Sequence, residues 1–143
     1  LFSNIFYTNK NNTNKIIRRW QSNLNEGIQY NDKLKKKIYN GWMPPHTALF
    51  FKKNLLNDIG YYDENFKISS DYDFIIRLFG KEDLKIFFLN KFTVKMRIGG
   101  ISNNSIKNIL IKMNEDYKIM KKFKLNAFKA LLLKNLSKIK QFF

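Results

Sequence analysis

Two aspartates stand at the start of a segment that turns from polar to apolar, residues 69–74, with the sequence SSDYDF. The serines can cap a helix predicted over residues 71–79, which puts Asp71 and Asp73 in its first turn. A carboxylate there is stabilised by roughly 0.3–1 kcal/mol, and this alone can explain both residues. A general base at the mouth of a cleft is a second interpretation, and a D-x-D metal site is a third.

A second segment with chemical potential is residues 41–47, GWMPPHT. Its two prolines fix their own φ angles and remove two backbone donors, so the segment should be rigid and non-helical. Trp42 and His46 on such a segment are typical of a sugar-binding wall. The alternative is a packed tryptophan and a buried core histidine.

The third segment, residues 97–102, follows a predicted strand with the sequence RIGGIS. Gly99 and Gly100 could bring backbone amides close to an anion, beside Arg97. A plain turn is the alternative. The segment has neither a G-x-G-x-x-G nor a G-K-[ST] pattern, so no nucleotide-binding loop is predicted.

The elements that would position these residues follow from hydrophobic periodicity and from turn residues. An asparagine-rich turn at residues 9–14 predicts a hairpin. Gly60 and Gly80 should each end a helix. In order we expect strands at 1–8 and 15–20, a short helix at 32–39, a strand at 47–51, a helix at 53–59, a loop at 61–68 and the helix at 71–79.

Two strands and two amphipathic helices complete the prediction. The strands are residues 84–89 and residues 91–98, and the second alternates with Phe92, Val94, Met96 and Ile98 on one face. Residues 102–105 can cap a helix whose apolar residues keep three-and-four spacing: Ile106, Ile109, Leu110, Met113, Tyr117 and Met120. A last helix carries Leu125, Phe128, Leu132, Leu136 and Ile139.

Composition limits the partners. The 143 residues contain 44% hydrophobic residues and no cysteine, which favours a packed core and excludes disulfides and thiolate chemistry. The formal charge of +16 attracts nucleic acid, anionic lipid or nucleotide phosphates, although abundant A/T-rich codons could also supply the lysines. From Tyr117 onward the sequence has no acidic residue, so the basic C-terminal helices could lie on an anionic membrane or pack on the domain.

Four segments, in order and in spacing, resemble the second half of bacterial family-2 glycosyltransferases: residues 41–47, 60–63 (GYYD), 70–74 (SDYDF) and 96–103 (MRIGGISN). These inverting enzymes of the GT-A fold assemble capsule, lipopolysaccharide and exopolysaccharide. The resemblance covers nearly the whole chain. It implies an α/β, partial GT-A fold, a mixed sheet with flanking helices that lacks the nucleotide-binding half and ends in amphipathic helices.

The resemblance also implies roles for individual residues. Asp71 takes the position of the general base that deprotonates the acceptor hydroxyl, and Ser70 stands where many relatives carry glutamate. Trp42 and His46 belong to the acceptor wall, although Thr47-Ala48 departs from the usual histidine-proline-threonine pattern. The other expected substrate contacts are Asp73, Arg97, Gly99 and Gly100.

The same resemblance places the metal-binding D-x-D, with its Mg²⁺ or Mn²⁺, outside this chain, so no metal ligand is expected here. We expect residues 1–103 to be the acceptor-side half of a catalytic domain and residues 104–143 to be its basic amphipathic helices. Because the chain opens at Leu1, directly in a predicted strand, we expect a truncated fragment that is inactive alone.

The expected partners are a nucleotide-sugar donor, held by the missing half, a glycan or lipid-linked acceptor, and an anionic membrane surface. Nucleic acid is not expected, because the lysines are spread along the chain and no motif accompanies them. The predicted location is cytoplasmic and peripheral, at the inner face of the plasma membrane. A basic nucleic-acid- or membrane-binding module without catalysis is the alternative function.

Overall fold

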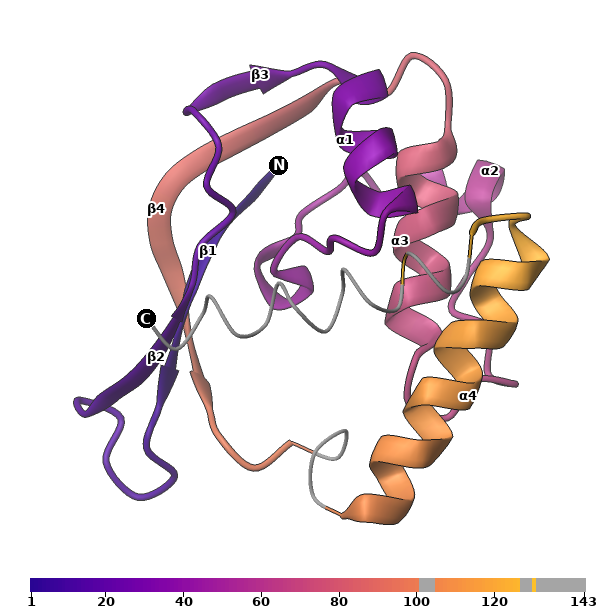
Figure 1. Cartoon of the computed structure of the whole chain (residues 1–143). Helices are drawn as coiled ribbons and strands as arrows, with labels where there is room; N and C mark the ends of the chain where they lie inside the picture. The colour runs from indigo at the N-terminus through magenta and orange to yellow at the C-terminus, as the bar shows by residue number, and fades with distance from the viewer. Residues whose placement is uncertain (101–104, 127–129, 131–143) are drawn as a thin grey trace.

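The computed structural model describes residues 1–100, 105–126 and 130. It shows an α/β arrangement in which a four-stranded mixed sheet lies on one side and the helices lie on the other (Figure 1). The strand order is β2-β1-β4-β3. The predicted class of mixed α/β fold is therefore confirmed.

The predicted N-terminal hairpin is confirmed, with β1 at Phe2–Thr8 pairing antiparallel to β2 at Ile16–Trp20. Its turn is held by the side chain of Asn9, whose Oδ1 accepts hydrogen bonds from the amides of Asn11 and Asn12. This is the local side-chain-to-backbone bonding that makes asparagine a turn residue.

The two predicted C-terminal strands are one continuous strand, β4 at Ile86–Arg97. Its first residues pair antiparallel with β3 at Gly27–Gln29, a short strand that periodicity did not predict. The rest of β4 pairs in parallel with β1 through two register shifts. The predicted alternation holds for Phe92, Val94 and Met96, which are half-buried, while Thr93 and Lys95 between them are exposed. Ile98, which was predicted on the same face, is exposed.

The main core forms where β1 and β4 meet α3 at Ser70–Gly80. Phe2 is fully buried and contacts the rings of Phe79 and Phe88 at centroid distances of 6.4 and 5.1 Å. α1 at Asn31–Tyr39 adds Leu34 and Ile38 to this core. Because α3 is buried on most of its circumference, its few polar side chains are held in fixed surroundings.

α2 at Leu55–Ile59 ends as predicted at Gly60, whose φ of +75° is the left-handed conformation that favours glycine. The predicted strand at residues 47–51 is wrong. The segment forms the 3-10 helix η1 at His46–Ala48, and Leu49 makes only an isolated bridge to Phe2. Pro45 directly before η1 favours a tight helical turn over a strand, since proline cannot donate to a ladder.

α4 at Ile106–Lys122 begins as predicted with a cap, because the Ser105 side chain accepts a hydrogen bond from the Asn108 amide. The orientation of α4 was not predicted. Its acidic residues, Glu115 and Asp116, are buried against the domain, whereas most of its apolar residues face solvent. The helix predicted from Leu125 onward lies almost wholly outside the described residues, as does much of the basic C-terminal segment.

No helix among the described residues is both long enough and apolar enough to span a membrane.

Candidate active site

The structure brings together two residues that the sequence separates by a loop and a helix. Nε2 of His46 lies 3.3 Å from Oδ2 of Asp71, and both side chains are 30% accessible. His46 is held by the buried Pro44 and Pro45 that precede it, and Asp71 stands in the first turn of α3. A rigid loop and a buried helix therefore fix this pair.

The hydrogen bonds of the pair show which group is available for chemistry. Asp71 Oδ1 accepts a hydrogen bond of 2.7 Å from the Tyr72 amide, and Oδ2 faces His46. Each carboxylate oxygen has two lone pairs, so Asp71 can still accept a proton or another hydrogen bond. Nδ1 of His46 is buried and makes no hydrogen bond to the described residues. A base must reach its substrate, so Asp71 and not His46 is the candidate base.

An aromatic wall stands next to the pair. The ring of Trp20, on β2, meets His46 edge-on at a centroid distance of 5.8 Å. Tyr7, on β1, stacks on Trp20 at 6.2 Å, and the Arg18 guanidinium lies 4.0 Å from the centre of the Tyr7 ring. Burial raises the pKa of Tyr7, with the nearby charge of Asp71 adding to the rise and Arg18 opposing it. The Tyr7 ring of this wall is therefore close enough to Asp71 to feel its negative charge.

Tyr62 is a second tyrosine near Asp71, in the loop before α3. Its ring stacks on Phe74 with a centroid distance of 4.5 Å and remains 52% exposed. Burial raises the pKa of Tyr62, and the negative charge of Asp71 raises it further. Both tyrosines are neutral hydrogen-bonding groups near a carboxylate, which is a suitable setting for a polyhydroxylated ligand.

Asp73 has a different environment from Asp71, although only one residue separates them. Its side chain is fully buried, and its carboxylate contacts Arg77 Nε and Lys122 Nζ, each at 2.8 Å. Arg77 also donates to the carbonyls of Ile59 and Tyr61. Asp73 thus ties α3 to α4 and to the loop that carries Tyr62. Its predicted contact with substrate stays a prediction, and the structure assigns it a structural role.

The structure does not bring the other predicted residues to the pair. Trp42 is partly buried and packs against the core, edge-on to Phe2 at 6.1 Å, and the tryptophan next to His46 is Trp20. Arg97 is exposed at the end of β4, where it pairs with Thr8. Gly99 and Gly100 follow in open surroundings, with a φ of +100° at Gly99. Substrate binding by Trp42, Arg97, Gly99 and Gly100 stays a prediction.

Sequence reasoning missed Trp20, Tyr7 and Tyr62. The signal available was the strand alternation at residues 15–20, which puts Trp20 and Arg18 on one face. Which face meets His46 depends on how η1 packs against the sheet, and periodicity does not report such tertiary packing.

Two cavities of the described part lie elsewhere. One of about 430 Å³ is lined by Asp58, Arg77 and Phe123, among others, and one of about 530 Å³ is lined by apolar residues around Leu49 and Phe79 together with charged residues such as Lys52 and Asp83. Neither includes His46 or Asp71. Within residues 1–100 and 105–126, no group of three histidine, aspartate or glutamate side chains could hold a metal ion.

Comparisons of this chain with protein-family models, with curated proteins and with solved structures gave no match.

Proposed function

We propose that this chain forms the acceptor side of an inverting glycosyltransferase site of the GT-A type, with Asp71 as the general base. The observation that carries the proposal is the His46–Asp71 pair, half-exposed beside Trp20. Two residues that the resemblance assigned to the acceptor side, 25 positions apart in sequence, lie in contact.

In the proposed reaction an acceptor hydroxyl attacks the anomeric carbon of a nucleotide sugar from the face opposite the leaving group. The hydroxyl proton passes to the Asp71 carboxylate as the new C–O bond forms, and the nucleoside diphosphate leaves with the electrons of the broken bond. A positioned general base typically contributes about 10²- to 10⁴-fold to such a rate. The divalent ion that would neutralise the diphosphate belongs outside this chain in the proposal.

His46 has a positioning role in this proposal. Its Nε2 lies 3.3 Å from Asp71 Oδ2, and the Tyr72 amide donates a hydrogen bond to Oδ1, so both carboxylate oxygens have a neighbour that limits their rotation. Trp20 lies edge-on to His46 and stacks with Tyr7, and the half-exposed phenol of Tyr62 is near enough to feel the charge of Asp71. Aromatic faces and hydrogen-bonding edges are the groups that a sugar ring needs from its binding site.

The experiment is a transfer assay on the complete gene product that carries this sequence. Nucleoside diphosphate release from a panel of nucleotide sugars is measured with and without oligosaccharide acceptors. We expect acceptor-dependent release that Asp71→Asn lowers at least 100-fold. Release that does not depend on acceptor, or that survives Asp71→Asn, contradicts the proposal.

A further inference from the structure

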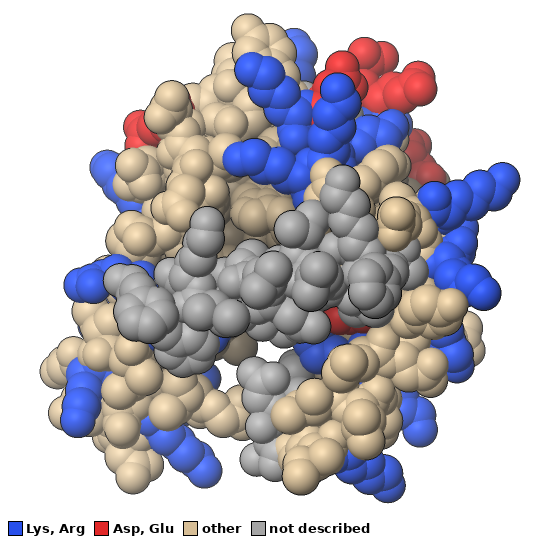
Figure 2. All heavy atoms as spheres, in the orientation of Figure 1, with Lys and Arg blue, Asp and Glu red and all other residues tan. Residues whose placement is uncertain are grey.

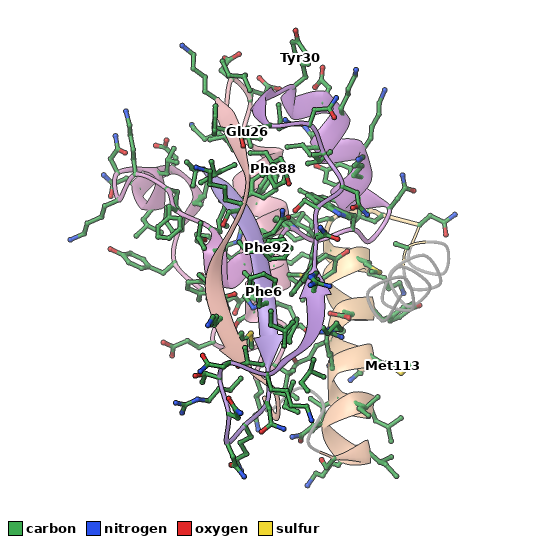
Figure 3. The ribbon with its side chains drawn as sticks, turned by 90° about the vertical axis from the view of Figure 1, so that its left-hand side faces the viewer. Phe6, Glu26, Tyr30, Phe88, Phe92 and Met113 are labelled. Atoms are coloured by element: carbon green, nitrogen blue, oxygen red, sulfur yellow. The ribbon has the colours of Figure 1, made fainter. Side chains whose placement is uncertain are left out.

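Five apolar side chains of α4 face solvent: Ile106, Ile109, Leu110, Met113 and Tyr117 are between 42% and 78% exposed. At 100° per residue they occupy about 100° of the helix circumference, and we call them the α4 stripe. This is the width of a stripe that normally faces a protein core. Figure 3 shows Met113 projecting from α4 on the side away from the sheet.

The charges of α4 are separated in the same way. Lys107, Lys118 and Lys121 are exposed, and at 100° per residue all three lie along one edge of the α4 stripe. The two acidic residues of α4 point into the domain, where Glu115 bonds to the backbone of residues 67–69 and Asp116 pairs with Lys112. On the face drawn in Figure 2, the lower part of α4 carries tan and blue atoms without red.

We propose that the α4 stripe and its three lysines form a docking surface for an anionic membrane, with α4 lying flat in the headgroup region. An apolar face beside a row of basic residues is the pattern of helices that bind in this way. The acidic side chains that would repel anionic lipid are the ones that the fold has buried. This inference does not depend on the role proposed for Asp71.

A second helix is a weaker candidate for the occupant. A coiled-coil seam that starts at Ile106 and Ile109 would continue through Met113, Asp116 and Met120. Asp116 is only 4% exposed, which interrupts that seam. A seam in the other register, through Ile106, Leu110, Met113 and Tyr117, ends at the next position, because Met120 is fully buried in the domain. The accessible stripe is then about 18 Å long, which is short for a coiled coil but sufficient for contact with a membrane surface.

The test is co-sedimentation of the 143-residue chain with vesicles of phosphatidylcholine alone and of phosphatidylcholine with 40% phosphatidylglycerol. We expect binding to the anionic vesicles that falls as salt rises. The double variant Ile106→Asn, Leu110→Asn should lower the partition coefficient at least tenfold. Changing Lys107, Lys118 and Lys121 to glutamine should cost roughly fivefold for each lysine.

Matched controls separate this surface from the general basic charge. Ile28→Asn on β3 makes the same chemical change at a side chain that is 75% exposed. Glutamine at Lys10, Lys36 and Lys53 removes the same charge from other exposed positions. We expect Ile28→Asn to lower vesicle binding less than twofold. The control variant with glutamine at Lys10, Lys36 and Lys53 should lower binding clearly less than the variant with glutamine at Lys107, Lys118 and Lys121.

Three results would overturn the proposal. The first is equal binding to the two kinds of vesicle. The second is a double α4 variant that binds as the Ile28→Asn control does. The third is a dimer in sedimentation velocity that the double variant dissociates while vesicle binding is unchanged, because the stripe would then be a self-association face.

Discussion

Glu115, in the middle of α4, accepts a hydrogen bond from the backbone amide of Ser69, the residue that immediately precedes α3, at 2.9 Å. The same carboxylate accepts bonds from the amides of Lys67 and Ile68, also at 2.9 Å. The first amides of a helix lack partners within the helix, and a negative charge near them interacts favourably with the helix dipole. α4 therefore holds the turn that leads into the helix that carries Asp71, including the amide of its N-cap residue Ser69.

We expect Glu115→Gln to destabilise the fold by about 2–4 kcal/mol, because the amide has one acceptor oxygen for three donors and no charge. Thermal melts and hydrogen exchange at residues 67–72 measure the effect, and protection should fall first at that segment. Glu82→Gln, at an exposed glutamate, is the control. Equal melting temperatures for the two variants would show that Glu115 does not hold α3.

Substitutions of Asp71 and Asp73 should have different effects, the first on activity and the second on stability. Asp71→Asn in the complete gene product should lower kcat by about 10²–10⁴ with an unchanged melting temperature. Asp73→Asn leaves two cations beside a neutral amide. Since the Lys122 side chain is 45% accessible and Arg77 is 19% accessible, we expect a loss of about 2–3 kcal/mol of stability, below the full cost of a broken buried pair.

The outcome that contradicts this division is a drop in melting temperature for Asp71→Asn without a fall in kcat. Asp71 would then act only as a first-turn carboxylate of α3, which is the alternative interpretation of the sequence.

The two tryptophans give a second matched pair. Trp20→Ala should lower the affinity for an acceptor saccharide about tenfold, which corresponds to ~1.4 kcal/mol, with a small effect on stability. Trp42→Ala should cost about 3 kcal/mol of stability, because Trp42 packs on Phe2 in the core. Ligand-observed NMR titration with acceptor saccharides and chemical denaturation measure the two effects. If only Trp42→Ala weakens saccharide binding, the acceptor wall is formed by residues 41–47, as predicted from the sequence, and not by Trp20.

Local features of this fold were predictable from sequence. The asparagine turn at residues 9–14, the end of α2 at Gly60 and the Ser105 cap each depend on nearby residues, so their signals lie within a few positions. That Asp71 and Asp73 have different surroundings also followed, because two positions along a helix turn the side chain by about 200°. The choice of Asp71 as the base came from the resemblance and stays a prediction.

Features that depend on tertiary contacts were not predictable. The Ser69 and Ser70 side chains were expected to cap α3, but Ser69 makes no capping bond, and the turn before α3 is held instead by Glu115, 46 positions after Ser69. The α4 periodicity correctly predicted a helix and gave no indication that its apolar stripe faces solvent. The apolar stripe and the acidic pair lie on different faces of α4. Which face is buried is decided by the surface against which α4 packs, and the α4 sequence alone does not contain that information.

The buried side chain of Tyr72 should make the fold less stable as the pH becomes alkaline. Its side chain is fully buried on α3, and burial raises its pKa far above the usual value near 10, with the charge of Asp116 adding to the rise. A tyrosine with a raised folded-state pKa contributes its full stability below the unfolded-state pKa. That contribution is lost as pH rises from about 10 towards the folded-state value, because only the unfolded chain can then release the proton.

We therefore expect Tyr72→Phe to flatten the alkaline limb of the stability curve. Between pH 10 and pH 11 the wild type should lose about 1 kcal/mol more than Tyr72→Phe, because one proton is worth ~1.4 kcal/mol per pH unit at full release. Urea denaturation at half-unit steps from pH 8 to pH 11 measures this slope. Tyr30→Phe, at a ring that is 74% exposed, is the control and should keep the wild-type slope. Parallel curves for wild type and Tyr72→Phe would show that the Tyr72 phenol ionises as readily in the folded protein as in the unfolded chain.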